Sequence, residues 1–275
     1  MVSFFVLGEE DLAFSLEEQA HNKRSKVNIF EINVMSMLLC FQTYSVSSNY
    51  IMHWIHDYQL FLFDFDGLLV NTEEIHFLAY KKMCAANGFV LDWNFDRYCK
   101  AAHYHPEALR EEIYAYFPAL KQKEPDWKIL YAQKRQAVVS LVKEGAVHLM
   151  PGTYSLLESI KNANIKRCVV THSPDELVYA IRQQHEILNT IPFWITREDY
   201  THPKPDPECY IKAIERYSKP GEAVIGFEDS PRGIRALLGS SAKPVLICQV
   251  KYPEIPDFIA QGVAHFPSLE AIRDT

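Results

Sequence analysis

The sequence has little of what marks a disulfide or zinc scaffold, a nucleic-acid-binding protein or a membrane protein. Its six cysteines include no CxxC pair, and both zinc sites and disulfide frameworks depend on closely spaced cysteines. Lysine and arginine number 28, against 35 aspartates and glutamates, so the basic face of a nucleic-acid-binding protein is not expected. We expect reduced thiols, no nucleic-acid partner and a small-molecule ligand.

Long apolar runs are also missing. The first residues, MVSFFVLG, have no basic segment before them, which argues against a secretion signal. The stretch NIFEINVMSMLLCF is interrupted by Glu31, Asn33 and Ser36 and is shorter than the roughly 20 apolar residues of a membrane helix. We therefore expect a soluble, cytoplasmic protein with no membrane partner, and a monomer by default.

What is present is the composition of an ordinary globular protein, with 48% hydrophobic, 13% aromatic and 23% charged residues. A length of 275 residues allows one large domain or two modest ones. Residues 1–51 lack the alternation and turn signals of the later chain, and we interpret them as an N-terminal extension without an assigned role. They are either a partly helical appendage or an over-long start, and the self-sufficient segment that opens at Met52 favours the second interpretation.

From residue 59 onward, short apolar runs alternate with amphipathic helical stretches. Unbroken apolar runs are typical of strands buried on both faces of a parallel sheet, and a repeating strand-helix-strand pattern indicates an α/β fold. The fold class is therefore predicted as α/β, with a doubly wound parallel sheet. The predicted strands are LFLFDF (60–65), KRCVVTH (166–172), PFWIT (192–196), EAVIGFED (222–229) and KPVLICQ (243–249), and the predicted helices cover 153–163, 174–188, 206–217 and 230–239.

Residues 76–149 break this alternation, because they contain helical segments and no convincing strand. We predict an all-helical cap domain at 76–149, inserted into a core domain of residues 58–75 and 150–275. An insert after the first strand lies near the carboxyl ends of the strands, where ligands bind in open α/β sheets, and is placed to act as a lid. The helix boundary signals are a capping-box-like pair at Asn71 and Glu74, a stop at Asn87-Gly88, a start at Pro106 and a stop at Gly145.

Two aspartates, Asp64 and Asp66, end the first predicted strand in the run FLFDFDG. Side chains two apart on a strand point to the same side, and Gly67 permits a sharp exit from the strand. Adjacent carboxylates repel unless a cation joins them, and Mg²⁺ binds one or two carboxylates together with a substrate phosphate oxygen. Taken alone, this run also fits two solvated aspartates at a turn.

Further polar side chains follow the other predicted strands, and a parallel sheet would bring them to the same edge as Asp64 and Asp66. A nucleophile, metal ligands, a cation and a hydrogen-bond donor are the groups that phosphoryl transfer requires. They are Thr171, His172 and Ser173 after the second strand, Lys204 after the third, and Glu228, Asp229 and Ser230 after the fourth.

Four segments in this order resemble the ordered motifs of the haloacid dehalogenase superfamily, over residues 60 to about 250. The helical insert resembles the cap of the subgroup that includes β-phosphoglucomutase and many small-molecule phosphatases. The resemblance implies that Asp64 is a nucleophile that forms an aspartyl-phosphate, and that Asp66 protonates the leaving oxygen and later activates water. The dehalogenase branch lacks a carboxylate at the position of Asp66. The segments are DFDGLLVNTE, VVTHSP, HPKPDPE and GFEDSPRGIRA.

The resemblance also implies the remaining site residues. Thr171 would hydrogen-bond a phosphoryl oxygen, with capping of the next helix as the alternative, and Lys204 would offset the charge shared by Asp64 and the phosphate. The implied cofactor is Mg²⁺. Its implied ligands are Asp64, the backbone carbonyl of Asp66, Asp229 and Glu228, and the implied substrate-binding and phosphate-binding residues are Gly67, Thr171, His172, Lys204 and His76.

His76 matches a histidine of the mutase branch, although a histidine in the first turn of a helix is also commonly just exposed. The segment HYH (103–105) is expected at a helix start, and its two histidines lack the spacing of helical metal ligands, so no metal site is expected there. The mutase branch carries a glycine followed closely by an arginine in its cap loop, whereas this chain has KAAHYHPEALR, with no glycine and with Arg110 inside a predicted helix.

We therefore predict a magnesium-dependent phosphatase that acts on a small phosphorylated metabolite. A β-phosphoglucomutase-like sugar phosphomutase is the alternative. A non-catalytic binding module on the same fold is a third possibility, although Asp64, Asp66, Thr171, Lys204 and Asp229 are all retained.

Overall fold

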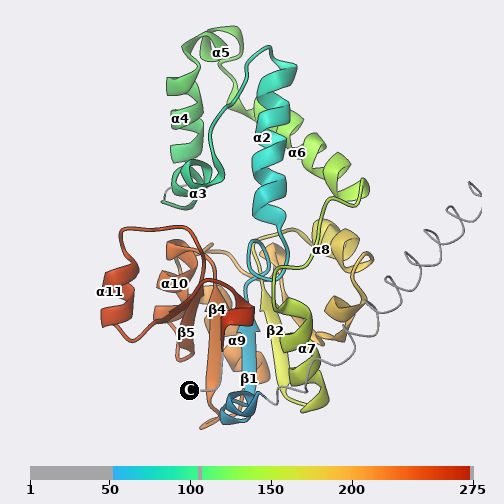
Figure 1. The fold of residues 1–275 in the computed structure, drawn as a ribbon, viewed down its shortest axis with the longest axis vertical. Helices are drawn as coiled ribbons and strands as arrows, with labels where there is room; N and C mark the ends of the chain where they lie inside the picture. The colour runs from blue at the N-terminus through green and yellow to red at the C-terminus, as the bar shows by residue number, and fades with distance from the viewer. Residues whose placement is uncertain (1–51, 105–106, 273–275) are drawn as a thin grey trace, which may run out of the picture. The chain divides into compact units, whose positions relative to one another are not determined.

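The structure, a computed structural model, describes residues 52–104 and 107–272 (Figure 1). The interpretation of residues 1–51 and the helix start predicted at Pro106 lie outside the described residues. A six-stranded sheet in the order β3-β2-β1-β4-β5-β6 forms the centre of the fold, and every neighbouring pair is parallel. Its strands are β1 (Leu60–Phe63), β2 (Lys166–Val170), β3 (Phe193–Ile195), β4 (Val224–Glu228), β5 (Lys243–Ile247) and β6 (Ala264–Phe266).

The central strands are largely apolar on both faces, and helices cover both sides of the sheet. Phe61 and Phe63 pack on one face with α7 (Thr153–Asn162) and α8 (Asp175–Arg182). Leu60 and Leu62 pack on the other face with α9 (Glu208–Tyr217), α10 (Pro231–Leu238) and α11 (Ile255–Ala260). The predicted doubly wound α/β fold is confirmed.

The five predicted strands are all present, and β6 is an additional edge strand. One predicted helix is shorter than expected, since α8 ends at Arg182. The chain then forms the 3-10 segment η2 (Glu186–Thr190), which buries Ile187 and Leu188. The short segments η1 (His53–Asp57), η3 (Arg197–Asp199) and η4 (Leu269–Ala271) complete the core.

A helical cap is inserted between β1 and β2, and the described residues within 76–149 contain no strand. Figure 1 shows these helices beyond the carboxyl ends of β1, β2 and β4. They share a separate apolar cluster that also takes in Tyr252 from the segment after β5. The predicted boundary at residue 76 falls inside α2 and stays a prediction. The cap helices are α2 (Thr72–Ala86), α3 (Phe95–Tyr104), α4 (Ala108–Tyr116), α5 (Pro118–Lys123) and α6 (Trp127–Lys143).

The predicted start of α2 at Asn71 is confirmed, because α2 begins at Thr72 with Asn71 as its N-cap residue. The capping hydrogen bond is not formed, however: Asn71 Nδ2 donates to Glu74 Oε2 at 3.3 Å, and Asn71 Oδ1 accepts from the backbone N–H of His148 at 2.8 Å, which ties the start of α2 to the chain returning from the cap. The helix α3 runs through Tyr104, so the His103-Tyr104 pair stands at the end of a helix and not at its start. The predicted stop at Asn87-Gly88 is confirmed, because α2 ends at Ala86 and Gly88 has a φ of +93°.

Among the helices of the described residues, none is both long and apolar enough to span a lipid bilayer.

Candidate active site

The register of the sheet fixes where the candidate site lies. Phe63, the last residue of β1, pairs with Val169 of β2 and with Phe227 of β4, so these three strands end within one residue of the same level. Asp64 follows directly, and its backbone N–H donates to the carbonyl oxygen of Phe227 at 3.0 Å. The predicted convergence of polar side chains at this edge therefore begins with a buried carboxylate that the sheet itself holds in place.

Lys204 reaches this carboxylate from the loop between η3 and α9. Its Nζ donates to Asp64 Oδ1 at 2.5 Å and to the carbonyl oxygen of Val170 at 2.9 Å. It also forms an ion pair with Glu228 Oε1 at 2.6 Å. All three side chains are buried, so the ammonium group is held between two carboxylates and excluded from bulk water.

The charges at this point oppose one another strongly. Burial raises the pKa of Asp64 well above its ordinary value; the Lys204 ammonium opposes this effect, and Glu228 and Asp66 add to it. Burial acts to lower the pKa of Lys204, but Asp64 and Glu228 outweigh it and raise that pKa well above its ordinary value. Lys204 therefore stays charged, whereas its single ammonium group does not fully offset the cost of burying an ionised Asp64 carboxylate.

Asp229 adds a third carboxylate. The carboxylate oxygens of Asp64, Glu228 and Asp229 include a set that lies within 4.8 Å of one another. Burial, followed by Asp64, Glu228 and Glu73, raises the pKa of Asp229 well above its ordinary value. One lysine thus faces three acids, which leaves an excess of negative charge that a further cation would offset.

The donor set fits Mg²⁺ as that cation, because the ligand atoms are hard carboxylate oxygens. Within the described part of the chain, the Asp229 carboxylate accepts no hydrogen bond, so its oxygens remain available. Glu228 is different, since Lys204 and the hydroxyl of Tyr210, at 2.5 Å, both occupy its Oε1. Lys204 likewise occupies one oxygen of Asp64, so Asp229 is the most available ligand, and the metal roles of Asp64, Glu228 and Asp66 stay predictions.

Gly67 lies against this group of carboxylates. Its φ is +82°, in the left-handed region, where glycine carries no steric penalty. A Cβ atom built on it would overlap Asp229 Oδ2. Glycine is required here both for the turn and for the close approach of Asp229, and no structural observation assigns it a contact with phosphate.

Asp66 projects into a ring of hydroxyl groups. Its Oδ1 accepts from Thr72 Oγ1 at 2.6 Å, and its Oδ2 accepts from Thr171 Oγ1 at 2.7 Å and from Ser173 Oγ at 2.9 Å. These three hydroxyl donors fix the orientation of the Asp66 carboxyl group. Thr171 is thus directed at Asp66 here, and its contact with a phosphoryl oxygen stays a prediction.

His172 is exposed beside this ring. The hydroxyl of Tyr200 donates to the carbonyl oxygen of Thr171 at 3.1 Å, so its oxygen must accept from His172 Nδ1 at 2.9 Å. This assigns the Nδ1–H tautomer and leaves Nε2 as the group turned away from Tyr200. Although the residue as a whole is exposed, partial desolvation of its ring, then Arg232 and Arg197, lower the pKa of His172.

His76 meets a lysine that the sequence did not reveal. The Nζ atom of Lys134, in α6, lies 3.0 Å from Nδ1 of His76. Because a charged lysine can only donate hydrogen bonds, Nδ1 accepts and the ring hydrogen lies on Nε2. Burial lowers the pKa of Lys134 to about 8, although Glu73 and Asp66 act in the opposite direction. The charges of Glu73 and Asp66 therefore act on Lys134, so this lysine lies close enough to interact electrostatically with the site.

Three side chains that support the site were missed in the sequence: Thr72, Tyr210 and Lys134. Ser173 was expected at this edge but was given no role, and its hydroxyl donates to Asp66. Tyr210 and Lys134 follow the apolar periodicity of their helices and look like core positions. Arg110 does lie in a helix, α4, as predicted, where it is paired with Glu107 and lies 3.8 Å from Glu111.

The family to which the chain belongs can be read from its sequence match. The profile of the family described as haloacid dehalogenase-like hydrolase matches residues 61–244. The chain is a haloacid dehalogenase-like hydrolase. The match spans all of the cap and the core from β1 into β5, including each of the four motif segments.

Known members of this family are distant relatives. The haloacid dehalogenase-like chain is 27% identical over 207 residues to protein CbbY of Rhodobacter capsulatus, covering 72% of this chain and 88% of that protein. It is 28% identical over 178 residues to a phosphorylated carbohydrates phosphatase of Thermotoga maritima, covering 64% and 78% respectively. The crystal structure of CbbY from Rhodobacter sphaeroides in complex with phosphate shares the fold, with a TM-score of 0.59, 23% identity and coverage of 78% of this chain and 95% of that one.

Proposed function

We propose that the protein is a magnesium-dependent phosphatase that hydrolyses a small phosphorylated metabolite through an aspartyl-phosphate on Asp64. The observation that carries this proposal is the buried contact of Lys204 with Asp64 beside the carboxylates of Glu228 and Asp229. Asp64 is suited to attack a phosphoryl group, because the Lys204 ammonium and a cation held by the neighbouring carboxylates would offset the phosphoryl charge. The names of the relatives, a phosphorylated carbohydrates phosphatase and a 2-deoxyglucose-6-phosphate phosphatase, support the same reaction class.

In the first step, an oxygen of Asp64 bonds to phosphorus while the bond from phosphorus to the leaving oxygen breaks. The leaving alkoxide takes a proton from Asp66, which must be protonated for this step. In the second step, ionised Asp66 removes a proton from water, whose oxygen attacks phosphorus and releases inorganic phosphate and free Asp64. Covalent catalysis thus divides one difficult displacement into two easier ones.

The surrounding side chains have separate tasks in this scheme. Lys204 holds the Asp64 carboxylate in one orientation and offsets charge on the transferring group. Thr72, Thr171 and Ser173 hold Asp66, so the proton carrier sits at a fixed place. Bound Mg²⁺ would supply Lewis-acid polarisation of a phosphoryl oxygen, and Asp64 with Asp229 would hold it.

A β-phosphoglucomutase-like activity is the second candidate. Its support is a 24% identical relative, β-phosphoglucomutase of Bacillus subtilis, together with His76 at the position typical of that branch. Against it, Arg110 is held within α4 by two glutamates, away from a loop position that could grip a second phosphate group.

Turnover of p-nitrophenyl phosphate tests the proposal directly. We expect hydrolysis with Mg²⁺, loss of activity with EDTA and recovery with added Mg²⁺, and no activity in Asp64→Asn. Absence of turnover across a panel of phosphorylated metabolites, with or without metal, would favour a binding module instead. For the mutase, β-glucose 1-phosphate with catalytic 1,6-bisphosphate would give glucose 6-phosphate without free phosphate.

A further inference from the structure

The loop that carries Lys204 has few apolar contacts to hold it. Thr201, His202, Pro203 and the residues at 205 and 206 are exposed, whereas Lys204 is buried with only 8% of its surface accessible. Because the neighbours of Lys204 on this loop are exposed, burial of apolar surface contributes little to holding the loop in place. The position of the ammonium group must therefore depend on polar contacts that fix the loop backbone.

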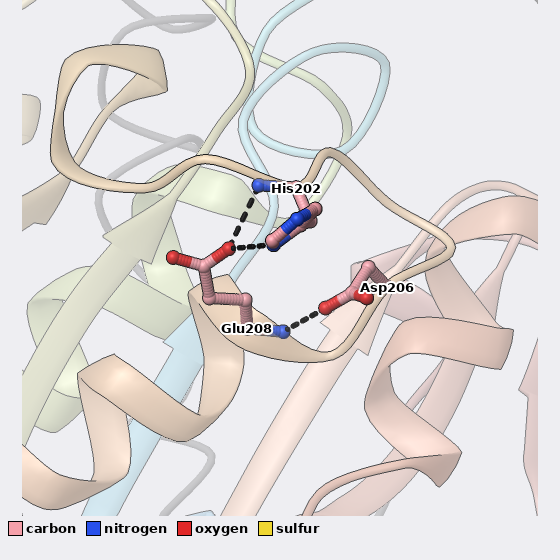
Figure 2. A group of neighbouring side chains, drawn as sticks. All are labelled: His202, Asp206 and Glu208. Carbon is pink, nitrogen blue, oxygen red and sulfur yellow. Dashed lines mark hydrogen bonds and ion pairs between the residues drawn. The ribbon is translucent and has the colours of Figure 1, made fainter.

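One carboxylate, that of Glu208 at the start of α9, makes most of these contacts. It accepts from the backbone N–H of Thr201 at 3.1 Å and of His202 at 2.7 Å. It also accepts from His202 Nδ1 at 2.8 Å and from Lys212 Nζ at 2.6 Å. Figure 2 shows the Glu208 carboxylate turned toward both the backbone and the ring of His202.

The other side of the loop is fixed to the same helical turn. Asp206 Oδ1 accepts from the backbone N–H of Glu208 at 2.9 Å, and the N–H of Asp206 donates to the carbonyl oxygen of Pro203 at 3.1 Å. Lys212 also donates to the carbonyl oxygen of Asp199 at 3.1 Å. The chain on both sides of Lys204 is thereby attached to the first turn of α9.

His202, Asp206 and Glu208 also have ligand atoms within 4.8 Å of one another, a spacing that would suit a cation. Glu208 does not behave as an open ligand, however, because its oxygens already receive N–H donors. The Lys212 hydrogen bond, followed by those from the backbone of His202 and Thr201, lowers its pKa to about 2. A cation bound there would have to displace the contacts that hold the loop.

We propose that Glu208 is a positioning residue that fixes the loop of Lys204 and so sets the ammonium group between Asp64 and Glu228. The expected effect of Glu208 on catalysis rests on the proposed function, whereas its expected effect on the position of Lys204 does not. α9 also supplies Tyr210, whose hydroxyl holds Glu228 and whose ring lies 5.0 Å from Lys204 Nζ. One helical turn therefore orients both the lysine and its second carboxylate partner.

The decisive experiment measures how fast each lysine of the full-length protein is acylated by acetic anhydride, with the products read by mass spectrometry. In the native protein, Lys204 should react far more slowly than exposed lysines. In Glu208→Gln, which keeps the side-chain size but loses the charge, Lys204 should react at least about tenfold faster. Lys134, buried in the cap, is the internal standard and should not change.

Glu215→Gln is the matched control, since Glu215 lies on the same helix and is exposed. It should leave the labelling of Lys204 unchanged. If Glu208→Gln does not fold, Lys212→Met, which removes one donor to Glu208, should move Lys204 labelling in the same direction by a smaller factor. Unchanged Lys204 labelling in the folded variants would overturn the proposal, as would equal increases at Lys204 and Lys134.

Kinetics of the same variants separate this inference from the proposed function. If the protein hydrolyses phosphate esters, Glu208→Gln should lower kcat by about 10-fold to 100-fold with a smaller change in KM, and Glu215→Gln should do neither. Faster labelling of Lys204 in a protein that hydrolyses nothing would support the positioning role and contradict the proposed function. Full activity of Glu208→Gln, with Lys204 labelled as slowly as in the native protein, would support the proposed function and contradict the positioning role.

Discussion

Lys134 offers a sharp test of the electrostatics next to the site. Its side chain is 5% exposed, and Nζ lies 4.9 Å from the ring centroid of Tyr80 and 5.5 Å from that of Tyr131. Burial lowers its pKa from an ordinary value of 10.5 to about 8. This difference corresponds to about 3 kcal/mol of folding free energy lost while the lysine is charged in both states. Replacement by methionine, which is also long and unbranched, removes the charge.

The sign of the pH effect follows from the lowered pKa. Below about pH 8, Lys134 is charged in the folded and the unfolded chain, so the full penalty is present. Between about pH 8 and 10.5 the unfolded chain binds more protons than the folded one, so stability contributed by this group rises with pH. Above 10.5 the lysine is neutral in both states and the penalty is gone.

Urea unfolding of wild type and Lys134→Met, at several pH values from 7 to 10.5, measures this effect. At pH 7 the variant should be more stable by up to about 3 kcal/mol, less whatever the contacts with His76 and the two rings contribute. The advantage should shrink steadily as the pH rises. Lys128→Met, at an exposed position of the same helix, should show no such trend. A difference between wild type and Lys134→Met that stays constant across this range would refute the reasoning.

Three further predictions concern the site. Tyr210→Phe removes the buried donor to Glu228 and should lower the free energy of unfolding by about 1.5–3 kcal/mol in urea titrations; a loss no larger than in Tyr179→Phe, at an exposed tyrosine, would contradict this. Gly67→Ala should abolish magnesium-dependent turnover because its Cβ overlaps Asp229, whereas Gly221→Ala, with a similar φ of +85° and no atom near the added Cβ, should only cost stability; equal activities in the two variants would refute the overlap. Mg²⁺ should raise the melting temperature of wild type, since a ligand that binds only the folded state stabilises it. Asp229→Asn should be more stable than wild type without metal, because one of the mutually repelling carboxylates is gone, and should show no shift with Mg²⁺; a full shift in that variant would remove Asp229 from the metal site.

The sheet was predictable because its central strands are buried on both faces. β1 is apolar throughout, β2 ends in the apolar run Cys168–Val170 and β4 is apolar up to Phe227, and parallel pairing then brings the residues that follow to one edge. The edge strand β6 is only Ala264–Phe266, with its middle residue, His265, exposed. So short a segment carries no periodicity that distinguishes it from a loop.

Side-chain partners were harder to predict than positions. The sequence placed Asp64, Lys204, Glu228 and Asp229 at one edge, but it could not show that Lys204 divides its contacts between Asp64 and Glu228. Glu228 was predicted as a metal ligand alone, because a pairing with Lys204 depends on how deeply the loop enters the core. Asn71 was expected at the start of α2 beside Glu74, but its other partners, His148 and Ala146, could not be predicted because they lie across the whole cap in sequence.

The aspartyl-phosphate is the central claim, and chemical trapping tests it most directly. Protein caught during turnover of a phosphorylated substrate with Mg²⁺ is reduced with borohydride, which converts an acyl phosphate to an alcohol, and is then digested and analysed by mass spectrometry. The account predicts homoserine at position 64 and an intact Asp66. Steady turnover without any modification of Asp64, or with the modification at Asp66, would contradict it.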